Sequence, residues 1–305
     1  MTALGTALLR GAVTSPFKRA GLPGATLPAG REVLPAAPAA PGPLAAYRSL
    51  CGFTDPDGLP PTYPHVLGFP LAMRVMTDRS FPLPVLGLVH TWIEITGHRP
   101  LHPADALELQ VFAEELTPHR RGTEVTMVTE ARRAGETVWE SRSGYLSRHP
   151  TGAGTRTPAP APEPPRGLPA VAEWRLPSDL GRRYGAASGD RNPIHLHPLT
   201  ARLFGFPRHI AHGMWTVARC LAEWENGVGA GAGSGAGAGS GAGAGSGAGA
   251  GSGNTARPGR IRSVRADFRA PVLLPATVTY AASGGDFQVR GVSRVHLTGT
   301  VVRDG

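Results

Sequence analysis

The chain has 305 residues, of which 41% are hydrophobic and 17% charged, so it can bury a core and is not globally disordered. It carries 31 Lys and Arg against 22 Asp and Glu, a formal charge of +9. The arginines are scattered, without a long cationic run or an aromatic-basic module. We therefore expect no nucleic-acid partner, and favour a phosphorylated ligand or an acidic carrier protein.

The cysteine pattern indicates a reducing compartment. Cys51 and Cys220 lie far apart without a CxxC motif, which excludes a disulfide framework. No apolar stretch reaches the roughly 18 residues of a membrane span. We expect a cytoplasmic protein. The alternative is mitochondrial, because residues 1–21 are basic and no acidic residue precedes Glu32, as in a transit peptide.

The front half of the chain, residues 1–149, reads as two helices followed by strands. Helical spacing covers 42–52 and 65–76. Segments rich in Val, Thr and aromatic residues, separated by turn residues, predict strands over 85–98, 105–117, 122–135 and 136–148. A Pro/Ala-rich stretch, 150–170, then predicts a semi-rigid linker.

The back half, residues 171–305, has the same order of elements. Helices are predicted over 176–189, 198–205 and 212–225, and strands over 261–272, 276–283, 286–294 and 295–303. Between them, 229–253 repeats "GAGAGS" with a period of six, which we interpret as a flexible surface loop rather than a silk-like stack. Helices followed by an antiparallel meander are typical of an α+β unit.

The halves also match in detail. "YRSLCG" (47–52) has the Tyr and Gly spacing of "YGAASG" (184–189), and His65 aligns with His209 when "PHVLGFPLAMRVM" is laid over "RHIAHGMWTVARC". We infer a duplicated unit. Only the second copy has an acid after the Gly: Asp190, where the first has Phe53.

The polar segment "SGDRNPIHLHPLTARLFGFPRHIAHG", residues 188–213, is the candidate site. Pro193 disfavours helix at Asn192, so we expect a fixed turn that aims Asp190 and His195 at one point. A carboxylate and an imidazole that share one water can activate it or return a proton to a leaving hydroxyl.

Gly213 opens the helix predicted after this segment. Its N–H has no partner within the helix and suits an anion or a developing oxyanion. Glycine also lets a ligand approach the backbone closely. An acid/base pair beside such a donor fits chemistry next to a carbonyl.

Other interpretations stay open at this point. "SGDRNP" is also the composition of an ordinary capped turn, and His197 reads as a surface residue. His195, His197, His209 and His212 together contain the donors of a metal site, although neither "HLH" nor "HIAH" has the i, i+4 spacing of a helical zinc motif.

The segment resembles the signature of the MaoC-like, (R)-specific enoyl-CoA hydratase (hydratase 2) family. The matching positions are Ser188, Gly189, Asp190, Asn192, Pro193, Ile194 and His195, then Ala211, His212 and Gly213. "FRAPVLLPATV" (268–278) resembles the family's strand after the helix, but Pro275-Ala276-Thr277 replaces the usual Pro-Gly-Asp turn. The front half resembles the degenerate first domain of two-domain actinobacterial (3R)-hydroxyacyl-thioester dehydratases.

This resemblance implies an α+β double hot-dog fold, in which two tandem units, each an antiparallel sheet wrapped around a central helix, form a pseudo-dimer. It implies reversible syn addition of water to trans-2-enoyl thioesters in fatty-acid metabolism, giving (3R)-3-hydroxyacyl thioesters, with neither metal nor cofactor. Asp190 and His195 would hold the water and transfer protons, and the Gly213 N–H would polarise the thioester carbonyl. Ser188, Asn192 and His212 would support them.

The resemblance also bears on partners. The substrate would be a thioester of CoA or of acyl carrier protein, and a homodimer of the two-unit chain is compatible with it. Arg262, Arg265 and Arg269 are candidates for substrate phosphates, although their spacing does not alternate cleanly along a strand. A non-catalytic acyl-binding or heteromeric hot-dog subunit, and a hot-dog thioesterase, are the alternative functions.

Overall fold

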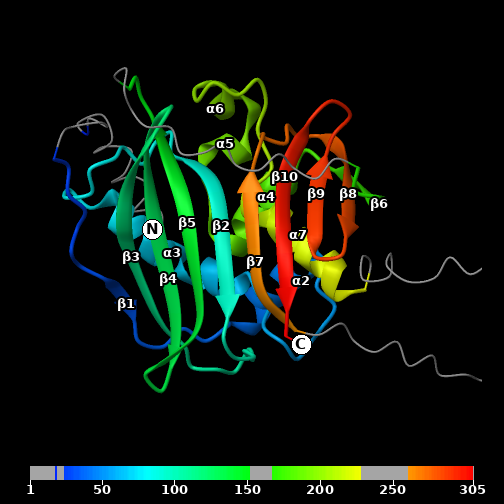
Figure 1. Cartoon of the computed structure of the whole chain (residues 1–305), viewed down its shortest axis with the longest axis horizontal. Helices are drawn as coiled ribbons and strands as arrows, with labels where there is room; N and C mark the ends of the chain where they lie inside the picture. The colour runs from blue at the N-terminus through cyan, green and yellow to red at the C-terminus, as the bar shows by residue number, and fades with distance from the viewer. Residues whose placement is uncertain (1–17, 19–23, 152–166, 228–259, 305) are drawn as a thin grey trace, which may run out of the picture.

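The computed structural model describes residue 18 and residues 24–151, 167–227 and 260–304. Within them, ten strands form one sheet in the order β1-β3-β4-β5-β2-β7-β10-β9-β8-β6 (Figure 1). The basic N-terminal segment apart from residue 18, most of the Pro/Ala-rich linker and the "GAGAGS" repeat lie outside the described residues. The predictions made for them therefore stay predictions. No helix in the described ranges is long and apolar enough to cross a membrane.

The front half supplies the left part of the sheet in Figure 1. Its elements are β1 (Glu32–Leu34), α2 (Pro41–Cys51), α3 (Tyr63–Thr77), β2 (Val89–Gly97), β3 (Glu108–His119), β4 (Gly122–Arg133) and β5 (Glu136–Arg148). Ala134 and Gly135 join β4 to β5, and both have positive φ, 50° and 83°. Two such residues make the tight turn that matches the twist of an antiparallel hairpin.

The back half repeats this plan. Its elements are β6 (Ala170–Leu176), α4 (Leu180–Ser188), α5 (Pro193–Leu196), α6 (Pro198–Arg202), α7 (Gly213–Glu225), β7 (Ile261–Phe268), β8 (Ala276–Ser283), β9 (Asp286–Arg290) and β10 (Val295–Arg303). Helix α7 is almost wholly buried, including Met214, Trp215 and Trp224. Its Met and Trp side chains are therefore core residues.

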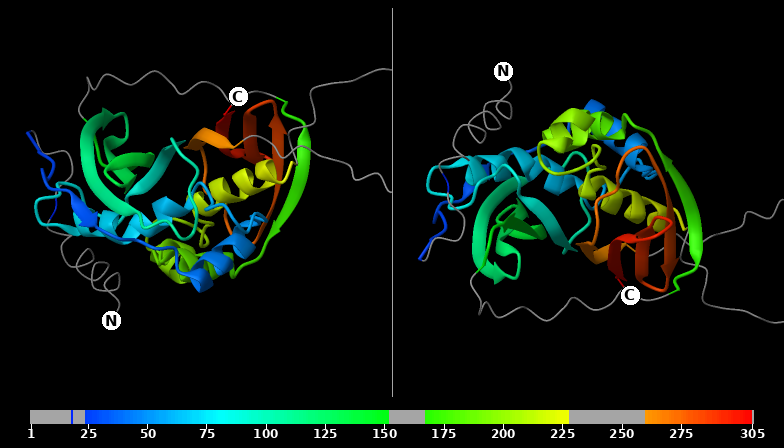
Figure 2. Two further views of the ribbon diagram at one scale, coloured as in Figure 1. Left: turned by 90° about the horizontal axis from the view of Figure 1, so that it is seen from below. Right: turned by 90° about the horizontal axis from the view of Figure 1, so that it is seen from above.

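The two halves are related by a pseudo-twofold arrangement about the seam between β2 and β7. Outward from this seam the order is β2-β5-β4-β3-β1 on one side and β7-β10-β9-β8-β6 on the other, so corresponding strands occupy corresponding places. Antiparallel pairing across the seam sets Ile95 opposite Val264. Each half-sheet curves around a long helix, which is α3 in the front half of the chain and α7 in the back half (Figure 2). The predicted double hot-dog fold is confirmed.

The repeated "Y-x4-G" spacing has a structural counterpart. Tyr47 in α2 and Tyr184 in α4 are both fully buried, and their ring centroids are 6.0 Å apart. Each helix then ends at a glycine with positive φ, Gly52 at 87° and Gly189 at 81°. This left-handed conformation at a helix end is one that glycine adopts without strain. The agreement supports the duplicated unit.

Three elements were not predicted from the sequence. β1 has three residues and β6 begins at Ala170, the last residue of the predicted linker, so both short strands precede the helices of their halves. The third is α5, because the turn expected around Pro193 continues into one helical turn that contains His195. The interpretation of this stretch as a non-helical turn was wrong beyond Asn192. Asn192 itself is extended, with ψ 126°, as a residue before proline should be.

Candidate active site

Asp190, His195 and His212 come together in the back half. They come from the loop after α4, from α5 and from the residue before α7, and one ligand atom from each lies within 4.8 Å of the others. Segments 17 residues apart in the chain, α5 and the start of α7, thus form one cluster. The structure therefore joins the two parts of the motif that the sequence singled out.

A chain of local hydrogen bonds shapes the turn that carries Asp190. The Asp190 N–H donates to Ser188 Oγ at 3.2 Å, and the Asn192 N–H donates to Asp190 Oδ1 at 3.1 Å. The Asn192 side chain in turn accepts from the Ile194 N–H at 3.3 Å and caps α5. Ser188 and Asn192 thus form part of the turn that carries Asp190, and their predicted supporting role stays a prediction.

The backbone around His195 fixes the state of its imidazole. His195 Nδ1 lies 2.9 Å from the carbonyl oxygen of Ile210. Only an N–H can donate to a carbonyl, so Nδ1 carries the proton and Nε2 the lone pair. Helix α4 packs tightly on this segment: a Cβ on Gly181 would lie 1.9 Å from the His195 carbonyl oxygen. The available lone pair is the one a general base needs.

His212 bridges the two ends of the cluster. Its Nε2 is 3.0 Å from the Asp190 carbonyl oxygen and 3.7 Å from the Asp190 carboxylate. Its ring stacks on that of His195, with centroids 3.7 Å apart and planes inclined by 25°. His212 therefore links Asp190, His195 and the start of α7.

The electrostatics of the cluster follow from its burial. Burial raises the pKa of Asp190, although the nearby His195 and the Asn192 N–H act in the opposite direction. Burial lowers the pKa of His195, against the opposite effect of Asp190, and it lowers that of His212 further. An acid and a base whose pKa values approach each other are suited to proton exchange with a bound water or substrate.

Gly213 is the first residue of α7, and His212 before it is extended at φ −66° and ψ 132°. Its N–H is one of those that a helix start leaves without an intrahelical partner. A Cβ on Gly213 would lie 2.6 Å from Cε1 of Phe268, so the Phe268 ring lies directly against this glycine. A side chain there would have to displace the ring.

Two residues of the front half, His90 and Tyr145, form a group with Phe268 of β7 beside this centre. They were not identified from the sequence. The Phe268 ring centroid is 4.7 Å from that of His90, which stacks on Tyr145 at 4.5 Å and 14°. The pKa of Tyr145 is raised by burial and further by the charge of Asp190. His90 and Tyr145 are directly paired across β2 and β5. To identify His90 and Tyr145 from the sequence, one would have needed to know the register in which β2 pairs with β5.

The four histidines that the sequence offers as metal ligands do not form one cluster, because only His195 and His212 lie together. His197 is exposed and accepts from the Leu199 N–H through Nδ1, and His209 Nε2 lies 2.6 Å from the Ser178 carbonyl oxygen. The set with ligand spacing among the described residues is instead Asp190, His195 and His212. Stacked rings direct their nitrogen lone pairs side by side, whereas a tetrahedral ion needs them to converge. The arrangement favours hydrogen-bond chemistry.

The three candidate arginines lie apart. Arg265 stacks on Trp92 and pairs with Glu94 and Asp267, so its charge is already balanced. The Arg269 Nε donates to Thr298 Oγ1, beyond the end of β7. Arg262 lies near the start of the same strand and has no ion pair among the described residues. The structure does not bring these three side chains to one phosphate.

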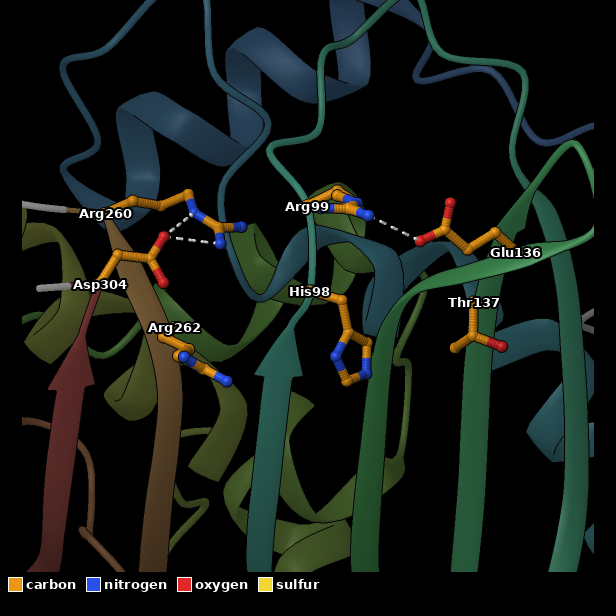
Figure 3. A pocket seen from close by; sticks show the side chains of 7 residues that line it. All are labelled: His98, Arg99, Glu136, Thr137, Arg260, Arg262 and Asp304. Atoms are coloured by element: carbon orange, nitrogen blue, oxygen red, sulfur yellow. Dashed lines mark hydrogen bonds and ion pairs between the residues drawn. The ribbon is translucent and has the colours of Figure 1, made fainter.

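Arg262 lines a hollow of about 620 Å³ at the seam between the halves (Figure 3). The hollow is lined by His98, Arg99, Glu136, Thr137, Arg260, Arg262 and Asp304. Arg99 pairs with Glu136 and Arg260 with Asp304. His98 follows the end of β2 and His90 lies near its start, so at roughly 3.3 Å per residue the two are about 25 Å apart along the strand. The hollow and the contact between His90 and Phe268 therefore lie at opposite ends of β2.

Comparisons with known proteins define the class. Residues 162–240 match the family model of the MaoC like domain. The chain is 36% identical over 272 residues to 3-hydroxyacyl-thioester dehydratase X of Mycobacterium tuberculosis, which covers 87% of this chain and 86% of that protein. This chain belongs to the MaoC-like dehydratase family.

Solved structures agree with the sequence comparison. The crystal structure of HtdX from Mycobacterium tuberculosis matches with a TM-score of 0.70 and 31% identity, covering 90% of this chain and 100% of that chain. A MaoC-like dehydratase from Phytophthora capsici matches with a TM-score of 0.67 at 20% identity, over 92% of this chain and 97% of that one. The second likeness bears on the fold alone.

Proposed function

We propose that this protein is a hydro-lyase that reversibly hydrates trans-2-enoyl thioesters to (3R)-3-hydroxyacyl thioesters in fatty-acid metabolism. The observation that carries the proposal is the meeting of Asp190 and His195 beside the free N–H groups at the start of α7. The relative named 3-hydroxyacyl-thioester dehydratase X, 36% identical along most of both chains, supports the same reaction.

In the hydration direction, Asp190 and the lone pair of His195 Nε2 hold one water and take a proton from it. The water oxygen bonds to the β-carbon of the enoyl group, and a proton is delivered to the α-carbon. The Gly213 N–H donates to the thioester carbonyl oxygen and stabilises the enolate-like charge that develops there. Dehydration reverses these steps.

Ser188, Asn192 and His212 act as positioning residues. Their contacts with the backbone and carboxylate of the Asp190 turn keep the carboxylate and the imidazole in fixed places. Fixed geometry matters because a proton acceptor must lie within hydrogen-bond reach of the proton that it removes. Loss of any of these contacts should lower turnover without abolishing it.

The acyl group is carried on CoA or on acyl carrier protein, and the charge of +9 favours either of these anionic carriers. Arg262 has no ion pair among the described residues, but the hollow that it lines lies at the other end of β2 from the contact between His90 and Phe268. We also propose a cytoplasmic location, which is supported by two buried cysteines that are both free. We assign catalysis to the back domain, 171–305. The front domain, 1–149, lacks an acid at the position of Asp190 and supports the back domain.

The test uses purified protein with crotonyl-CoA, following the enoyl absorbance and free thiol together, and an Asp190→Asn variant as control. The expected result is loss of enoyl absorbance without thiol release, with a rate at least about 100-fold lower in the variant. Thiol release would indicate a thioesterase. No reaction with either CoA or carrier-linked substrate, in a folded protein, would indicate a binding subunit and contradict the proposal.

A further inference from the structure

A group of polar side chains in the front half borders the reaction centre. We call it the front wall, and it consists of His65, His90, Ser141, Ser143 and Tyr145. His65 Nδ1 is 3.3 Å from Ser141 Oγ, the rings of His65 and His90 are 6.2 Å apart, and His90 stacks on Tyr145. His65, Ser141 and Ser143 are buried. The proposed mechanism uses none of these residues.

The front wall meets the reaction centre through His90, which contacts Phe268, and the Phe268 ring lies against Gly213. Tyr145 stacks on His90, and the charge of Asp190 adds to burial in raising the pKa of Tyr145. In the proposed reaction the enoyl thioester lies with its β-carbon at Asp190 and its carbonyl oxygen at Gly213.

The opposite side of the centre is closed by backbone. A Cβ on Gly181 would lie 1.9 Å from the His195 carbonyl oxygen, and one on Gly185 would lie 2.7 Å from that of Asp190. Helix α4 therefore leaves no room for even a methyl group behind the reacting residues. In the proposed binding mode this leaves the side of the front wall for the acyl carbons beyond the double bond.

Two atoms of the front wall, His90 Nε2 and Ser143 Oγ, are screened from solvent and make no hydrogen bond of regular geometry among the described residues. The Ser143 hydroxyl interacts with the side chain of its neighbour Tyr145. A buried polar atom left without a partner is costly, and such atoms often belong to a ligand site. A long alkyl tail packed against these two atoms could not form a hydrogen bond with either, so the free-energy cost of burying them would remain. A tail with an oxygen would pair with them, and a short tail would leave room for water.

We propose that His90 and Ser143 are specificity-determining residues, and that the enzyme prefers enoyl thioesters with a short or oxygen-bearing acyl tail over those with a long alkyl tail. This inference rests on the hydratase function proposed above. It concerns the substrate class of the same site.

The experiment compares kcat/KM for crotonyl-CoA with that for trans-2-decenoyl-CoA, and for 5-hydroxy-trans-2-hexenoyl-CoA with that for trans-2-hexenoyl-CoA. In the wild type we expect at least about a tenfold preference for the first substrate of each pair. Ser143→Ala and His90→Phe should each shift both ratios toward the alkyl substrate by about fivefold or more. His90→Phe keeps a ring for the stack.

Ser147→Ala is the matched control, because Ser147 is buried on the same strand but lies outside the front wall. It should leave both ratios within about twofold. Thermal melts show whether each variant folds. If His90→Phe does not fold, the ratios measured for Ser143→Ala decide the test. An active wild type that prefers decenoyl-CoA, or variants that change both members of a pair equally, would overturn the inference but not the function. An inactive wild type would overturn both.

Discussion

The imidazole rings of His195 and His212 stack at 3.7 Å, and each ring is tied to a different backbone carbonyl, Ile210 for the first and Asp190 for the second. The base is therefore oriented by the main chain and not by a carboxylate. Two imidazoles this close cannot both be charged without strong repulsion. Asp190 is thus left as the anionic partner in the proposed reaction.

The link between His212 and Asp190 gives the first prediction. His212→Phe keeps a flat ring against His195 but removes the N–H that donates to the Asp190 carbonyl. Loss of a buried hydrogen bond costs about 1–3 kcal/mol, so we expect kcat/KM with crotonyl-CoA to fall about 5- to 150-fold. His197→Phe, at an exposed histidine outside the cluster, should retain wild-type activity. Equal effects of the two substitutions would contradict a specific role for His212.

The second prediction concerns the contact between Gly213 and Phe268. Gly213→Ala places a methyl group 2.6 Å from the Phe268 ring and displaces the start of α7 or the ring. Because a misplaced oxyanion donor is expensive, kcat should fall on the order of 100-fold. The double variant Gly213→Ala/Phe268→Ala relieves the clash and should recover at least about tenfold relative to Gly213→Ala. Additive losses would show that the ring contact is irrelevant.

The packing of α4 on α5 gives the third prediction. Gly181→Ala sets a methyl group against the backbone carbonyl of His195, which cannot move aside as a flexible side chain can. We expect a loss of about 1–3 kcal/mol in the free energy of unfolding, measured by urea titration, together with a lower kcat. Gly42→Ala, at a helical glycine with nothing within 4 Å, is the control and should be neutral or slightly stabilising. Equal stability of the two variants would contradict this packing.

Buried histidines predict a loss of stability in acid. Burial lowers the pKa of His65 from 6.5 to about 4 and that of His90 to about 3, so both stay neutral in the folded protein while the unfolded chain takes up protons below pH 6.5. Stability is therefore fully present above pH 6.5 and is lost as the pH falls toward 4. For His65 alone the loss is about 3 kcal/mol at the acid end. His65→Gln should flatten the fall in melting temperature between pH 7 and 4. A wild-type melting temperature that is constant over that range would oppose the account.

The pH dependence of activity has a defined sign. Hydration needs the Asp190 carboxylate and neutral His195. Because burial raises the pKa of Asp190, kcat/KM should fall in acid at a pH above 3.8, the ordinary pKa of aspartate. A profile of kcat/KM from pH 4.5 to 8.5 measures this. A profile that stays flat down to pH 4.5 would contradict a raised pKa of Asp190.

The repeated order of helices and strands and the site motif could be predicted from the sequence. Alternating strands and the "SGDRNPIH…AHG" pattern are local signals, and the motif is contiguous enough to identify Asp190, His195 and Gly213 as candidates. The three-residue β1 and the strand β6 beside the linker were missed because each is short and pairs only with a distant strand, β3 or β8.

The resemblance implied that the front half supports the site, but the residues through which it does so could not be predicted. His90, Tyr145 and Phe268 meet only because β2 pairs with β5 on one side and with β7 on the other. That register depends on the whole ten-stranded sheet. Arg262, Arg265 and Arg269 were predicted from their place on one strand after the insert, and β7 spreads them along its length and just beyond its end.

The most direct test of the central claim is the configuration of the product formed from crotonyl-CoA. We predict (3R)-3-hydroxybutyryl-CoA from the wild type, seen by chiral analysis of the 3-hydroxybutyrate released from it. Almost none should come from Asp190→Asn at an unchanged melting temperature. The (3S) product, or a full yield from the variant, would contradict hydration through Asp190 and His195.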